Sequence, residues 1–208
     1  MPGRTPYEAF SAFVTPLADA LKCVTWPKVA TSPGGTALLD RKHNLHLTGP
    51  QGENDGYLLL RGEDDLEFRA RMFYQIIEDR REGYGPYRCT TLGYDYSVRK
   101  PDGAAVVDYH WHPIGLSHER RPHIHLGSSQ LRPDAVLSNK QHMLTGRTTL
   151  ESVIRNLIGL GVRPRYPDWA AQLDICEGPH ILYRTWTNDY EQETGRKVAD
   201  DEAAPAIP

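Results

Sequence analysis

An alternation of apolar and polar side chains between Leu66 and Ile76 constrains the fold more than any other feature of this chain. Successive side chains of an extended strand point to opposite faces of a sheet. The pattern therefore predicts a long strand with one packed face and one solvated face. The competing interpretation is an amphipathic helix over residues 68–80. The apolar positions are Leu66, Phe68, Ala70, Met72, Tyr74 and Ile76, and Glu67, Arg69, Arg71 and Gln75 lie among them.

Further strands are predicted on both sides of this segment. Short apolar or aromatic-rich runs lie between turn sequences such as Gly49-Pro50-Gln51-Gly52 and Lys100-Pro101-Asp102-Gly103. Proline and glycine in such turns preset the backbone for a chain reversal, which joins neighbouring strands in antiparallel order. We expect an antiparallel β-meander of about five or six strands within residues 36–127. Its other predicted strands are 37–47, 57–61, 87–99, 105–112 and the segment ending at 127.

Helical spacing appears before and after the sheet. Apolar residues at steps of three and four predict a helix over residues 6–22, and Pro16 predicts that it is kinked or divided into two. A capping box at Thr148 and Glu151 predicts the start of a second helix. A third should begin near Asp168, and residues 180–186 fit either a helix or an edge strand. The expected class is α+β, an antiparallel meander flanked by an N-terminal helix and two C-terminal helices.

Composition limits the remaining choices. The 208 residues fit one domain over residues 1–187, with helices in 148–187 and a disordered acidic tail at 188–208. A formal net charge of −3 argues against a protein whose whole surface binds nucleic acid nonspecifically. We expect a cytoplasmic protein, because no apolar run approaches the roughly 20 residues of a membrane span. The three separated cysteines predict buried thiols rather than disulfides or a cysteine-rich zinc site.

Four of the nine histidines form two H-x-H pairs, in Tyr109-His110-Trp111-His112-Pro113 and in Pro122-His123-Ile124-His125-Leu126-Gly127. In extended chain each pair places both imidazoles on one face. If the two segments are antiparallel neighbours, a register that opposes His112 to His123 also opposes His110 to His125. Opposed Cβ atoms would lie roughly 4.5–5.5 Å apart. We interpret the other histidines as surface or core residues, namely His43, His46, His142 and His180, with His118 a weaker site candidate.

Two chemistries fit this patch. In the first, neutral imidazoles of His110, His112, His123 and His125 bind zinc or another divalent transition metal at about 2.0–2.1 Å. Asp108, on the same face, would then be a ligand, an orienting group or a base.

Alternatively, two of these histidines act without any cofactor as general base and general acid, since their ordinary pKa near 6.5 makes both protonation states accessible. Cleavage of RNA through its 2′-hydroxyl needs such a pair and cations for the phosphate. In this interpretation the substrate-binding residues are Arg120, Arg121, Arg147, Ser128 and Tyr109, the last for stacking on a base.

The two histidine motifs, together with Thr145-Gly146-Arg147-Thr148 and Arg184-Thr185-Trp186, resemble a group of uncharacterised bacterial proteins. The resemblance covers roughly residues 68–186. More distantly, the strand ending in Pro122-His123-Ile124-His125 is similar to TumE-type toxins of bacterial toxin–antitoxin pairs. That similarity implies action on RNA, control by a small helix-turn-helix antitoxin, and a functional role for His123 and His125. This chain is longer, with an additional N-terminal helix and an acidic tail.

The leading functional hypothesis is therefore a toxin-like protein that cleaves phosphodiester bonds of RNA through paired histidines and requires no cofactor. The alternatives are a non-catalytic partner-binding or regulatory module, in which the histidines only pack, and a histidine-ligated metal-binding protein.

Overall fold

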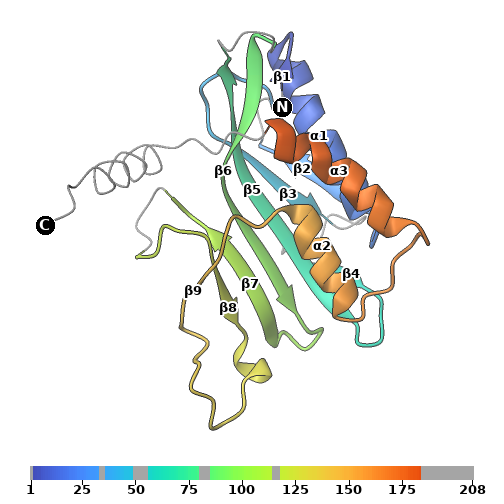
Figure 1. Cartoon of the computed structure of the whole chain (residues 1–208), viewed down its shortest axis with the longest axis vertical. Helices are drawn as coiled ribbons and strands as arrows, with labels where there is room; N and C mark the ends of the chain where they lie inside the picture. Colours follow the sequence, from blue (N-terminus) through green and yellow to red (C-terminus); the bar gives the residue numbers. More distant parts are fainter. Residues whose placement is uncertain (1, 33–35, 49–55, 80–84, 114–117, 184–208) are drawn as a thin grey trace, which may run out of the picture.

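The computed structural model describes residues 2–32, 36–48, 56–79, 85–113 and 118–183 (Figure 1). Their strands form one nine-stranded sheet with the order β2-β3-β5-β6-β7-β8-β9, in which β1 pairs with β6 and β4 with β5. The named strands pair antiparallel, with one N-terminal helix between β1 and β2 and two helices after β9, so the predicted α+β class is confirmed. The predicted tail and the Gly49 turn lie outside the described residues.

The strands are β1 (Pro2–Gly3), β2 (Lys28–Thr31), β3 (His43–Thr48), β4 (Leu58–Leu60), β5 (Leu66–Glu78), β6 (Tyr87–Arg99), β7 (Ala105–Trp111), β8 (His123–Leu126) and β9 (Met143–Leu144). The helices are α1 (Pro6–Leu21), the short 3-10 helix η1 (Ser128–Gln130), α2 (Leu150–Gly159) and α3 (Trp169–Tyr183). The sheet begins earlier than residue 36, because β1 and β2 had not been predicted. Both are short strands without an alternation of their own.

β5 is a strand of 13 residues, so the competing helix over residues 68–80 is wrong. Its predicted apolar positions are all buried, and the side chains between them are half-buried or exposed. Tyr94 and Tyr96 of β6 continue the buried face across the sheet, where their rings stack 4.7 Å apart. In β7 the same face carries Val107, Tyr109 and Trp111. One face of the sheet is therefore packed, as the alternation predicts.

The helices lie together over this packed face, while β7, β8 and β9 extend away from α1 and α3 (Figure 1). α1 is continuous through Pro16, so its predicted division into two helices is wrong. Proline removes one backbone hydrogen bond, but burial of Phe13 and Leu17 on either side favours the helix. No described helix meets the length and apolarity needed to cross a membrane.

The N-cap of α2 is Thr149, one residue later than the predicted capping box at Thr148. The Thr149 hydroxyl accepts a hydrogen bond from the Ser152 backbone N–H at 2.9 Å and donates one to Glu177 at 2.5 Å. Glu151 does not reach back to the cap but is fully buried, 3.9 Å from His180 Nε2 of α3. The helix start thus satisfies its orphan N–H groups through a different threonine.

Replacing Thr149 by alanine is expected to lower the free energy of unfolding by about 1 kcal/mol, because the cap is lost. Thr148→Ala is the matched control and should have little effect, since the backbone N–H of Thr148, which donates to the Tyr94 hydroxyl, is retained. Urea unfolding of both variants measures the difference. Equal losses would contradict this assignment of the cap.

Candidate metal centre

β7 and β8 are antiparallel neighbours, but their register differs from the predicted one. His110 lies opposite His123 and Asp108 lies opposite His125, whereas the prediction opposed His112 to His123 and His110 to His125. In this register Tyr109 pairs with Ile124 on the packed face. Because side chains alternate with a period of two, this two-residue shift keeps the four histidines on one face. The predicted pairing is wrong, and the predicted shared face is correct.

His110, His123 and His125 form a compact cluster on the face that the helices leave open. One ligand nitrogen from each lies within 4.8 Å of the others. Their ring centroids are 5.5 Å apart for His110 and His123, 5.3 Å for His110 and His125, and 5.1 Å for His123 and His125. Three nitrogens at 2.0–2.1 Å from a tetrahedral ion lie about 3.3 Å apart. Small side-chain rotations would bring these nitrogens together, so the three histidines can jointly hold a metal ion.

Two more imidazoles border this three-histidine cluster. His112 lies on its β7 side, with its ring centroid 5.4 Å from that of His110, and it is not among the three converging residues. His142 was interpreted from the sequence as a core or surface residue. Its ring centroid lies 4.6 Å from those of both His123 and His125. The sequence offered no pattern for His142, because β9 has only two residues and shows no alternation.

The backbone holds His123 in one orientation. Its Nδ1–H donates a hydrogen bond to the carbonyl oxygen of Arg121 at 2.8 Å, and its side chain is buried, with the residue 2% exposed. With Nδ1 protonated, Nε2 keeps its lone pair for a ligand. An outer hydrogen bond of this kind selects the tautomer and fixes the ring of metal-binding histidines.

Burial is the main influence on protonation of the cluster. It lowers the pKa of His110 and of His123, against the opposing influence of Asp95 on His110 and of the Arg121 carbonyl on His123. Burial likewise lowers the pKa of His112. Metals bind the neutral imidazole, so these shifts favour metal binding over proton binding at neutral pH.

Asp108 belongs to a hydrogen-bonded chain on the same face. The Ser97 hydroxyl donates to its carboxylate at 2.5 Å, and the Tyr57 hydroxyl, 2.8 Å from Ser97 Oγ, donates to Ser97 in turn. The Tyr57 ring is covered by the guanidinium of Arg99, 3.6 Å from the ring centroid. Tyr57 and Ser97 had no recognisable sequence pattern, because their relation to Asp108 depends on the pairing of distant strands.

Two of the predicted substrate-binding residues lie on the opposite, helix-covered face. The Tyr109 hydroxyl accepts a hydrogen bond from Asn156 of α2 at 3.2 Å, and the Arg147 guanidinium lies 4.7 Å from the ring centroid of Trp111. Both are therefore separated from the cluster by the sheet itself.

The other three predicted substrate-binding residues lie at the two ends of β8. Arg121 is exposed and forms a two-bond pair with Glu119, which holds the pKa of Glu119 at about 2. Arg120 and Ser128 are exposed, one before β8 and one after it. The structure thus brings Asp108 and the histidines together, flanks β8 with Arg120 and Ser128, and does not bring Tyr109 or Arg147 to them.

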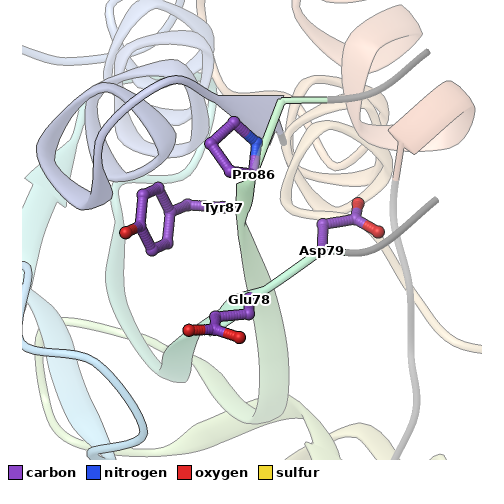
Figure 2. A pocket seen from close by; sticks show the side chains of 4 residues that line it. All are labelled: Glu78, Asp79, Pro86 and Tyr87. Carbon is purple, nitrogen blue, oxygen red and sulfur yellow. The ribbon is translucent and has the colours of Figure 1, made fainter. Parts of the chain in front are cut away.

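A pocket of about 270 Å³ where β5 ends and β6 begins also contains carboxylates (Figure 2). It is lined by Glu78, Asp79, Pro86 and Tyr87. Figure 2 shows the side chains of Glu78 and Asp79 pointing away from each other. Asp79 is paired with Arg88 at 3.8 Å. These carboxylates do not converge on one point, and the three-histidine cluster is the better metal site.

Comparison with protein-family models, curated proteins and solved structures found no match to this chain. The similarity to TumE-type toxins therefore stays a prediction. The functional argument rests on the geometry of the three-histidine cluster.

The metal-free protein is expected to lose stability as the pH falls from about 6.5 to 5. Burial lowers the pKa of His110 and His123 in the folded protein, so the unfolded chain binds more protons in this window and gains stability relative to the folded one. Carboxylates, with ordinary pKa values near 4, titrate mostly below it. The measurement is urea unfolding in chelator at several pH values.

A variant with both His110 and His123 replaced by glutamine should show a shallower dependence of unfolding free energy on pH across the same window. An identical slope in the variant and the unmodified protein would mean that other groups cause the effect.

Proposed function

We propose that the protein binds a divalent transition metal ion, zinc in the first instance, through His110, His123 and His125, and that it hydrolyses a phosphodiester bond. The observation that supports this proposal is the convergence of three imidazole nitrogens within 4.8 Å on an open sheet face. Catalytic zinc sites use three protein ligands and leave a fourth position for water. When bound, such an ion lowers the pKa of that water to about 7, which supplies a nucleophile at neutral pH.

The spacing of the nitrogens favours metal binding over the metal-free alternative. In an in-line displacement at phosphorus, the base and the acid act on opposite sides of the reacting group. Two hydrogen bonds of about 2.8 Å already sum to about 5.6 Å before the phosphate itself is counted. The three nitrogens within 4.8 Å of one another therefore suit a single ion better than a phosphate held between two of them.

The surrounding residues have distinct roles in this proposal. The Arg121 carbonyl keeps His123 in the tautomer whose Nε2 binds the metal. Asp108, opposite His125 and held by the hydroxyl of Ser97, supplies a carboxylate that accepts the proton of the attacking water. Arg120 and Ser128, at opposite ends of β8, bind different phosphates of an extended substrate.

Single-stranded RNA is the substrate that we propose, with a small helix-turn-helix protein as the antitoxin that controls the activity. Both follow from the similarity of the His123 and His125 motif to TumE-type toxins. The open face also suits an extended ligand, because none of the described helices covers the histidines on that side (Figure 1).

The test is metal analysis of untagged protein together with cleavage of single-stranded RNA before and after chelation. We expect close to one zinc per chain, loss of cleavage in chelator, and recovery when zinc is restored. Cleavage by metal-free protein with a bell-shaped pH profile would replace the metal mechanism by acid–base catalysis. Protein with neither metal nor cleavage would contradict the proposal and favour a partner-binding module.

A further inference from the structure

A fourth imidazole lies at the distance expected of a fellow ligand. Imidazoles bound to one tetrahedral ion at 2.0–2.1 Å have ring centroids about 5 Å apart. The centroid of His142 is 4.6 Å from those of both His123 and His125, which is closer than any pair within the three-histidine cluster. His142 therefore lies next to two of the three proposed ligands of the ion, His123 and His125.

The position of His142 in the fold differs from that of the other three. His110, His123 and His125 come from β7 and β8, which are paired along most of their length. His142 is exposed and immediately precedes β9, a two-residue strand at the edge of the sheet. Only two residue pairs join β9 to β8. A short edge strand with few backbone hydrogen bonds opens at low free-energy cost, so His142 can move while the three-histidine cluster stays in place.

The distances also show that His142 is not already part of the converging set. The nitrogens within 4.8 Å of one another belong to His110, His123 and His125, and His142 is not included. It lies on the β9 side, against His123 and His125, whereas His110 approaches from β7. A small shift of the chain around His142 would bring its nitrogen to the position left open by the three ligands.

We infer that His142 is a fourth, exchangeable ligand of the metal ion, bound when no substrate is present and displaced by a phosphate oxygen of the substrate, so that the attacking water would enter as a fifth ligand. The inference rests on the proposed metal site. Ligand exchange replaces one metal–nitrogen bond with one metal–oxygen bond, so it requires no oxidant or further reactant. A four-histidine site is closed and protected, and departure of His142 converts it to the three-ligand site that can act on substrate.

The test uses Co²⁺ as a spectroscopic probe and the full chain in the unmodified, His142→Ala and His118→Ala forms. His118 is the matched control, because it is also an exposed histidine and lies between β7 and β8, outside the three-histidine cluster. We expect His142→Ala to bind Co²⁺ roughly tenfold more weakly than the unmodified protein, a loss of affinity within the range for changes next to a metal site. The visible spectrum of its bound Co²⁺ should also differ. His118→Ala should match the unmodified protein.

Inorganic phosphate tests the exchange itself. It should change the Co²⁺ spectrum of the unmodified protein, and it should do so at lower concentration in His142→Ala, where no imidazole competes. Equal affinity and spectrum in His142→Ala and the unmodified protein would show that His142 is not a ligand. A spectrum of the unmodified protein that phosphate never alters would show a permanent ligand and overturn the exchange. Failure of the unmodified protein to bind any Co²⁺ would instead overturn the metal site itself.

Discussion

Replacement of His125 by alanine is expected to abolish both metal binding and RNA cleavage, while the thermal midpoints of the metal-free variant and the metal-free unmodified protein stay within about 2 °C of each other. His125 is half-buried on the open face of the sheet, where substitutions usually change stability by no more than about 0.5 kcal/mol. It supplies one of three converging nitrogens. Loss of a direct ligand should exceed the 10–100-fold cost of changing an outer hydrogen bond.

Metal content, RNA cleavage and thermal unfolding of the same preparation measure this effect. His112→Ala is the closest control, since it removes an imidazole from the same face that lies outside the three-histidine cluster, and we expect it to retain the metal. Unaltered cleavage in His125→Ala would contradict the proposed site. A large fall in the thermal midpoint of the metal-free variant, relative to the metal-free unmodified protein, would show that His125 acts through stability instead.

Replacement of Gly127 by alanine is expected to lower the free energy of unfolding by about 3 kcal/mol, at the upper end of the usual cost of overpacking. A Cβ atom at this position would lie 1.7 Å from the carbonyl oxygen of Ala105. That oxygen belongs to the backbone and cannot rotate away. The chain after β8 would have to move from the start of β7, and the hydrogen bond from the Gly127 N–H to the Val106 carbonyl, now 2.9 Å, would lengthen.

The same change should weaken metal binding, because Gly127 follows His125 by two residues and a displaced β8 would move that ligand. Gly146→Ala is the matched control, since a Cβ atom there would have no neighbour within 4 Å. We expect the control to stay within about 0.5 kcal/mol of the original stability. Urea unfolding and zinc titration of both variants check the prediction. A Gly127→Ala variant as stable as the control would contradict the close approach of Gly127 to Ala105.

The long strand β5 was predictable because its information is local. Alternation over Leu66 to Ile76 decides which side chains are packed, and the structure buries those residues. The same period of two placed His110 beside His112 and His123 beside His125 on one face, whatever the register. The start of helix α3 was predicted near Asp168 and lies at Trp169. The N-cap of α2 was predicted one residue too early, at Thr148 instead of Thr149.

Other parts of the site depend on contacts between distant segments. Ser97 meets Asp108 only because β6 pairs with β7, and Tyr57 reaches Ser97 across 40 residues of sequence. Tyr109 lies on the opposite face from His110 because neighbouring side chains of a strand alternate. That face is covered by α2, whose Asn156 contacts the Tyr109 hydroxyl, so Tyr109 does not lie on the histidine side. Arg147 was assigned to the site by its charge alone, and its position over Trp111 depends on the path of the chain after β9.

The sequence by itself determined the sheet-forming alternation and placed the two histidines of each H-x-H pair on one face of their strand, because side-chain direction in a strand repeats every two residues. Only the tertiary structure decided which imidazoles converge. The pairing of β7 with β8 places Tyr109 opposite Ile124 on the covered face, and the same register brings His110, rather than His112, opposite His123. The short edge strand β9 then adds His142, through a contact that no local pattern encodes.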